Sequence, residues 1–188
     1  MTVKTDISRF DIHDELTAPS GSEAILKSIQ AAGGDVSKFL GVLAGAPAAL
    51  RAYVRMHSEL QNGVLDRATR ERIALAVAEY RGDSYSTTLH ARSAQAAGLG
   101  LDEVSRARGF KSSDPRQAAL LALIEATVRP GERPAHHLVE EARETGWSDE
   151  ELIEAVAQVA LSEFQGLVAS AAALPLDQTA KSVLPSAA

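Results

Sequence analysis

Apolar residues recur along this chain at the three- and four-residue spacing of helices, and the pattern is clearest near its middle. Asp66 is a good N-cap for a helix predicted over 67–80, because its carboxylate can accept the first free backbone N–H groups. Asp83 can cap the next helix, over 84–97, which Gly98 would end. Long runs of the β-branched and aromatic residues that favour strands are missing. We therefore predict an all-α fold.

Breaker and capping residues place further helices on both sides of this central pair. Ser22 can cap the first helix, and Gly33 with Gly34 would end it. The motif Ser148-x-x-Glu151 is a capping box for a long final helix. Outside the central pair, helices are expected over 23–32, 36–43, 47–62, 116–128, 134–145 and from 149 onward.

Two helix pairs begin and end with the same kinds of capping and terminating residues. With an offset of 48 residues, Gly98 falls on Gly146. We interpret 66–104 and 114–152 as two degenerate helical repeats in one domain, although helix pairs of ordinary length that end in glycine are an alternative explanation. The chain would then divide into an irregular leader at 1–20, a single domain over 21–178 and a flexible tail at 179–188.

Composition narrows the possible functions. The 19 basic and 25 acidic residues give a net charge of -6, which argues against a nucleic-acid surface, because such a surface needs a basic stripe. The chain contains no cysteine, which excludes disulfides, thiolate nucleophiles and cysteine-ligated zinc.

No part of the sequence is typical of a membrane protein. The N-terminus has no apolar signal-peptide region. The most apolar stretch, 154–176, contains Glu163 and Gln165 and ends around Pro175, so we interpret it as a buried or interface helix. A cytoplasmic protein without membrane contact is the expectation.

The segment from Glu71 to His90 holds the candidate chemistry. Asp83, Ser86 and His90 fall within a sector of roughly 60° on one helix face, at about 100° per residue. Glu71 lies on the preceding antiparallel helix, and a tight turn at 81–82 could bring its carboxylate to that face. A carboxylate beside an imidazole can fix the tautomer and raise the basicity of the ring, so the group is suited to proton transfer.

Each of these residues also has an ordinary structural interpretation. Asp83 is a normal N-cap, Ser86 is common in a first helical turn, and Tyr85 would pack with its hydroxyl bonded to a neighbour. Glu79, farther along the helix of Glu71, is a second candidate carboxylate. Because no Gly-x-Ser-x-Gly elbow is present, a serine hydrolase is disfavoured.

The other histidines indicate no metal site. His136 and Glu140 have the spacing of two helical metal ligands, but no third histidine is nearby, and a solvated helix start is the preferred interpretation. His13 and His57 have no constellation of functional residues around them in the sequence. We expect neither a metal nor a cofactor.

The stretch 69–90 resembles the signature of the alkylhydroperoxidase D (AhpD)-like proteins of the carboxymuconolactone decarboxylase family. That signature is a Glu-bearing helix, a tight turn, Cys-x-Tyr-Cys-x-x-x-His and a helix that ends at glycine. Residues at matching positions are Glu71, Gly82, Tyr85, His90 and Gly98, while Asp83 and Ser86 stand in place of the two cysteines. The similarity extends more loosely over 46–177.

The resemblance implies an AhpD-like all-α fold, a homo-oligomer (trimer, hexamer or dimer) and a site at the start of the His-bearing helix. In redox-active members the cysteines reduce peroxide while glutamate and histidine shuttle protons. Only the proton-handling pair, Glu71 and His90, can be carried over to this chain. Decarboxylases of the family need no cysteine pair and act on a small acidic lactone, but they are shorter chains, so this sequence falls between the two branches.

These features favour a lyase- or isomerase-type enzyme that applies non-redox acid–base chemistry to a small organic acid, lactone or ketone. A catalytically silent oligomer that binds a small molecule is the alternative, and peroxidase activity is the least expected. The candidate catalytic residues are Glu71, His90, Ser86 and Asp83, and the candidate substrate-binding residues are Tyr85 and Glu79. The Ala-rich helix over 154–174 is the expected subunit interface.

Overall fold

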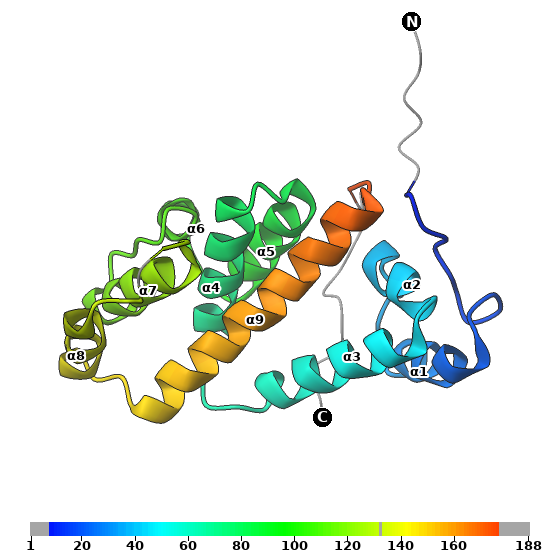
Figure 1. The fold of residues 1–188 in the computed structure, drawn as a ribbon, viewed down its shortest axis with the longest axis horizontal. Coiled ribbons are helices and arrows are strands. Elements are labelled where there is room, and N and C mark those ends of the chain that lie inside the picture. Colours follow the sequence, from blue (N-terminus) through cyan, green and yellow to red (C-terminus); the bar gives the residue numbers. More distant parts are fainter. Residues whose placement is uncertain (1–7, 132, 177–188) are drawn as a thin grey trace, which may run out of the picture.

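The computed structural model describes residues 8–131 and 133–176 (Figure 1). These residues form nine helices and no strand, which confirms the predicted all-α fold. The helices are α1 (Ser20–Ala31), α2 (Lys38–Ala44), α3 (Pro47–Gln61), α4 (Arg67–Tyr80), α5 (Ser84–Ala96), α6 (Leu101–Ala107), α7 (Pro115–Val128), α8 (His136–Glu144) and α9 (Asp149–Ala172). The tail predicted at 179–188 and the first seven residues of the leader lie outside the described residues.

Side-chain caps explain where several helices begin. Asp66 accepts a hydrogen bond from the Thr69 amide at the start of α4, and Ser148 forms a capping box with Glu151 at the start of α9, as the sequence predicts. The cap predicted for Ser22 is wrong. Because the carbonyl of Pro19 already accepts from the amides of the next turn, α1 begins three residues earlier than predicted and Ser22 is buried inside it.

Helix α9 is the central element of the fold (Figure 1). It packs against α2, α3, α4, α5 and α7, so that both ends of the molecule are joined through it. By length and composition α9 is the one helix in the described part of the chain that could cross a membrane. Its packing against five helices is that of a core helix, and buried polar side chains at Gln158 and Gln165 interrupt its apolar surface.

The apolar core divides into three clusters. One joins α4, α7 and α9 and includes Ile73 and Ile124, and a second joins α1, α2, α3 and α9 and includes Leu50 and Leu161. The third, around Leu75, fills the space beside α6. Helices α4 and α5 form the antiparallel pair that meets α9 between the first two clusters, and this junction holds the candidate site.

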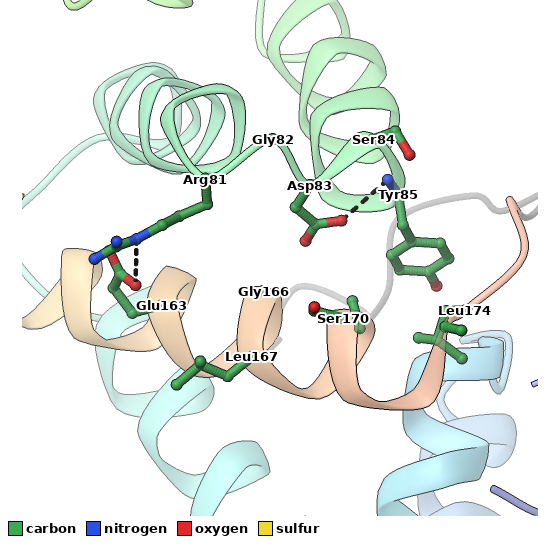
Figure 2. Close-up of a pocket in the computed structure, with 12 residues that line it drawn as sticks. Arg81, Gly82, Asp83, Ser84, Tyr85, Glu163, Gly166, Leu167, Ser170 and Leu174 are labelled. Atoms are coloured by element: carbon green, nitrogen blue, oxygen red, sulfur yellow. Dashed lines mark hydrogen bonds and ion pairs between the residues drawn. The ribbon is translucent and has the colours of Figure 1, made fainter. Parts of the chain in front are cut away.

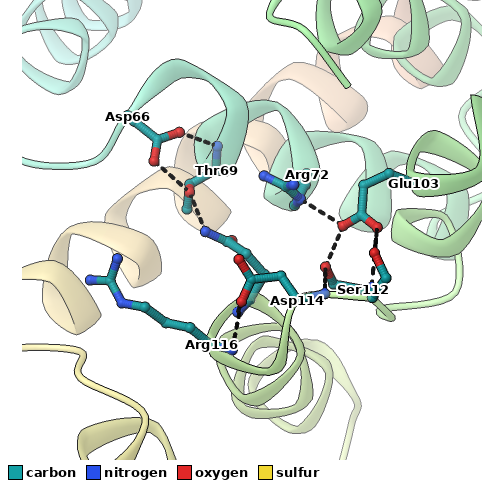
Figure 3. A network of polar contacts seen from close by, with 9 residues as sticks. Asp66, Thr69, Arg72, Glu103, Ser112, Asp114 and Arg116 are labelled. Carbon is teal, nitrogen blue, oxygen red and sulfur yellow. Dashed lines mark hydrogen bonds and ion pairs between the residues drawn. The ribbon is translucent and has the colours of Figure 1, made fainter. Parts of the chain in front are cut away.

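Helices α4 and α7 correspond in length and position. Each holds 14 residues and follows an aspartate cap, and Gly98 and Gly146 both have positive φ angles, 93° and 97°. Thr69 and Gln117, which are 48 residues apart, contact each other: the Gln117 amide donates to Thr69 Oγ1 at 2.8 Å within the polar network of Figure 3. These two residues occupy equivalent positions under the 48-residue offset, and the repeat itself stays a prediction.

Candidate functional site

Glu71 and His90 lie in direct contact. Glu71 on α4 and His90 on α5 approach until Oε2 and Nδ1 are 2.9 Å apart, and their side chains are only 15% and 12% exposed. The turn between the helices makes this possible, because Gly82 takes a φ of 65°, in the left-handed region that glycine tolerates best. The structure therefore brings together the two residues that the sequence singled out for proton transfer.

The contact leaves one nitrogen of His90 for chemistry. Since a carboxylate accepts the Nδ1 hydrogen bond, the neutral ring carries its proton on Nδ1 and presents an Nε2 lone pair. Nε2 is buried and has no hydrogen-bond partner within the described residues. A buried polar atom without a partner is unusual, and at a titratable ring it indicates a place for a reacting group or a water.

A small polar cavity lies beside this ring. It has a volume of about 40 Å³, enough for about one water or a group of two or three heavy atoms. Helices α3, α4, α5 and α9 all contribute to its wall. The lining side chains are His57, Gln61, Arg70, Glu71, Ala74, His90, Gln158, Leu161 and Gln165.

His57 belongs to this site, although the sequence analysis left it without partners. Its Nε2 lies 3.3 Å from Gln61 Nε2, and its ring lies 5.8 Å from that of Tyr53. Burial lowers the pKa of His57 to about 4; Glu71 opposes this shift, while His90 and Arg70 add to it. His57 is therefore uncharged at neutral pH. Its four-residue spacing from Gln61 on α3 was the signal that could have found it.

Two glutamines on α9 were also missed. Gln158 and Gln165 are buried in the most apolar stretch of the chain, and both line the cavity. Gln165 Nε2 donates to the Tyr53 hydroxyl at 2.9 Å, while burial raises the pKa of that phenol. Buried amides in an apolar helix are uncommon, so their presence was a usable signal.

Arg70 places a positive charge at the cavity. It is half-buried, and a guanidinium nitrogen donates to the carbonyl of Leu65. Burial lowers the pKa of Arg70, while the neighbouring carboxylate of Glu71 opposes the shift. A guanidinium beside an imidazole and a carboxylate can bind the carboxylate of an acidic molecule.

Asp83 faces a different pocket from His90. Its Oδ1 accepts from the amides of Tyr85 and Ser86, as an N-cap, and the side chain lines a pocket of about 580 Å³ between the start of α5 and the last turns of α9 (Figure 2). The rise of α5 separates Asp83 from His90 by about 10 Å. Ser86 is buried on the same helix face between them.

The two residues predicted to bind substrate lie in different environments. Tyr85 is buried in the core cluster that also includes Leu161, and it lines the larger pocket. Glu79 lines neither pocket; its side chain is 43% exposed and lies 3.9 Å from Arg108. The structure thus separates Glu79 from the candidate site, because the helical rotation beyond Glu71 turns it to the surface.

No group of three possible metal ligands occurs in the part of the chain that the structure describes. His136 and Glu140 lie 3.7 Å apart, but the histidine side chain is 86% exposed, as expected for a solvated helix start.

Comparisons with known proteins identify a matching family model and structures with a similar fold. The family model described as "Carboxymuconolactone decarboxylase family" matches residues 47–129. No curated protein matches the chain.

Solved structures share the fold. The AhpD core of a peroxidase-related protein from Ralstonia eutropha has a TM-score of 0.80 at 21% identity, covering 92% of this chain and 93% of that one. A peroxidase-related protein from Silicibacter sp. has a TM-score of 0.78 at 19% identity, covering 95% and 96%. A debrominase, crystallised as a cysteine-to-alanine variant with 2,3,4-tribromopyrrole, has a TM-score of 0.75 at 16% identity, covering 95% of both chains. At these identities the likeness establishes the AhpD-like fold.

Proposed function

We propose that the chain, of which residues 47–129 match the model of the carboxymuconolactone decarboxylase family, is a member of that family and a non-redox acid–base catalyst for a small organic acid, lactone or ketone. Glu71 and His90 are the proton-transfer pair. The observation that carries the proposal is the buried, unpartnered Nε2 of His90, which lies beside a polar cavity while Nδ1 is held by the carboxylate of Glu71.

The pair can take up and return one proton. Nε2 removes a proton from the carbon next to a substrate carbonyl, and the bonding electrons remain on the substrate as an enolate. The imidazolium that forms is stabilised by Glu71, whose carboxylate oxygen lies 2.9 Å from Nδ1. Nε2 then returns the proton to another atom of the enolate, which completes an isomerisation and restores the neutral ring.

The size and charge of the cavity favour an acidic substrate. A volume of about 40 Å³ admits the reacting group but not a whole lactone or keto acid. The rest of the molecule would lie where His57, Gln61 and Arg70 are half-buried. Arg70 is the cation at the cavity, so a carboxylate on the substrate is favoured over a neutral ketone.

Peroxide reduction by thiols is not part of the proposal. The chain has no cysteine, and Asp83 and Ser86 stand at the two positions where redox-active relatives carry one. We therefore propose neither of the activities, peroxidase or debrominase, that are named for the proteins of similar fold.

A second candidate function is binding without turnover, in a homo-oligomer. It is favoured by the contrast between the pockets, because the two that are large enough for a whole molecule, of about 580 and 500 Å³, are not lined by Glu71 or His90. For assembly, α9 exposes Ile153, Val156 and Leu167, whose large side chains are 72%, 41% and 68% exposed.

Deuterium exchange tests the catalytic proposal. Wild-type protein is incubated in D₂O with pyruvate, 2-oxobutyrate and acetoacetate, and NMR follows the loss of the hydrogens next to the ketone. We expect exchange above the uncatalysed rate, and a loss of roughly 10²- to 10⁴-fold in His90→Gln. His136→Gln, at an exposed histidine, is the matched control and should exchange at the wild-type rate. Undiminished exchange by His90→Gln would refute the assignment, and binding without exchange would favour the second function.

A further inference from the structure

The larger pocket is a separate feature with its own chemistry. Its volume of about 580 Å³ lies within the range of about 300–1,000 Å³ that is typical of small-molecule sites. Its walls are the turn and first residues of α5 on one side and the C-terminal turns of α9 on the other (Figure 2). It shares no lining residue with the Glu71–His90 cavity.

One carboxylate oxygen of Asp83 takes no part in capping α5 and lies at this pocket. Both capping bonds of α5, from the amides of Tyr85 and Ser86, go to Oδ1. Oδ2 is buried and has no hydrogen-bond partner within the described residues. It lies against bare backbone of α9, since a Cβ placed on Gly166 would meet it at 3.5 Å. A buried carboxylate oxygen without a donor is unfavourable, so a ligand that supplies a donor removes a penalty.

The other aspartate caps show that capping alone does not leave such an oxygen. Asp66 uses its second oxygen, because Oδ2 accepts from the hydroxyl of Thr69 at 3.1 Å. Asp114 caps α7 through the same two kinds of amide bond as Asp83, but it is exposed, so water can satisfy its second oxygen. Only at Asp83, among these three caps, does a buried and unpartnered oxygen lie on the wall of a pocket.

The charges at the pocket select a positive ligand. Arg81 Nε bonds both oxygens of Glu163, at 2.8 and 2.9 Å, so these two charges neutralise each other. Asp83 then leaves a net negative charge on the wall. The amides of Tyr85 and Ser86 at the start of α5 already bond Asp83, which weakens this helix end as an anion site. Leu167 and Leu174 add apolar surface beside the charge.

We propose that this pocket binds a small organic amine. Its ammonium group donates to Asp83 Oδ2, and its apolar part lies against Leu167 and Leu174. The proposal is independent of the acid–base function, because it uses other residues and needs no turnover.

Binding of three probes of similar size tests the proposal. The probes are 2-phenylethylamine, 2-phenylethanol and 3-phenylpropionate, each titrated into ¹⁵N-labelled full-length protein and followed by backbone amide shifts. We expect the amine to shift signals from 82–85 and 163–174 and to bind more tightly than the alcohol, and the carboxylate to leave these signals unmoved. Equal binding by the alcohol or the carboxylate, or no amine shifts at these residues, would overturn the proposal.

Two variants locate the interaction. Asp83→Asn keeps a good N-cap and a similar shape but removes the charge, so amine affinity should fall about ten- to hundredfold, as for the loss of a charged hydrogen bond. Asp114→Asn makes the same change at the equivalent cap of α7 and should leave the affinity within about twofold of wild type. Unchanged amine affinity in Asp83→Asn contradicts the proposal, and so does an equal loss in both variants. Keto-acid exchange by the wild-type protein is measured separately, so failure of the amine proposal and failure of the proposed function are distinguishable.

Discussion

The half-buried imidazole of His57 should make the fold sensitive to mild acid. Its pKa is lowered to about 4 in the folded protein, whereas an unfolded histidine titrates near 6.5. The unfolded chain therefore binds a proton first as the pH falls. The stability associated with neutral His57 is fully present above pH 6.5 and is lost as the pH falls from 6.5 towards 4.

The size of the loss follows from the two pKa values. Between pH 7 and pH 5, a group with pKa 6.5 unfolded and about 4 folded lowers the free energy of unfolding by about 2 kcal/mol. That is a large part of the roughly 5–15 kcal/mol by which a typical domain is stable. The carboxylate of Glu71 on α4 favours protonation of His57, but burial outweighs it, so the pKa of His57 is lowered.

Urea unfolding at both pH values measures this contribution. Wild type and His57→Gln are compared, because glutamine stays neutral and can still bond Gln61. We expect the wild type to lose about 2 kcal/mol more than His57→Gln between pH 7 and pH 5. His136→Gln, at a solvated histidine, should follow the wild type. Equal losses in wild type and His57→Gln would refute the reasoning, since the acid sensitivity would then come from other groups.

Two further predictions concern α9. Glu154→Ala removes the carboxylate that accepts hydrogen bonds from the amides of Val64 and Leu65 at 2.8 and 2.9 Å. It should lower the free energy of unfolding by about 1–3 kcal/mol and speed hydrogen exchange at these two amides. Unchanged exchange would contradict the role of Glu154. Gly166→Ala should raise the free energy of unfolding by up to about 1 kcal/mol, seen as a higher Tm, because alanine favours the helix. Its methyl group meets Asp83 Oδ2 at an ordinary contact distance. A lower Tm would show that the methyl does not fit.

Local sequence signals predicted the helices well, but they failed where contacts between distant segments determine the structure. The caps at Asp66, Asp83 and Ser148 are visible in the sequence because each needs only its own turn. Ser22 was misread because Pro19 starts α1 earlier and a serine in the next turn looks like a cap.

In the candidate site, too, local contacts could be predicted from the sequence and contacts between distant helices could not. The contact of Glu71 with His90 could be predicted, because one tight turn joins α4 to α5 and sets which faces meet. His57 and Gln165 could not be placed, since they reach the cavity only when α3 and α9 pack on that pair. Helical periodicity specifies which face of a helix is buried but not which distant helix covers it.

Neighbouring positions on α9 line opposite pockets: Gln165 faces the cavity of His90, and Gly166 faces the pocket of Asp83. The two pockets are thus divided by the thickness of a single helix. An occupant of one pocket that moves α9, and so alters the wall of the other pocket, changes the free energy of binding there. Thermodynamic reciprocity requires the effect to be mutual and equal in both directions, so a molecule at the acidic pocket would act as an effector of the histidine cavity to the same degree as the reverse.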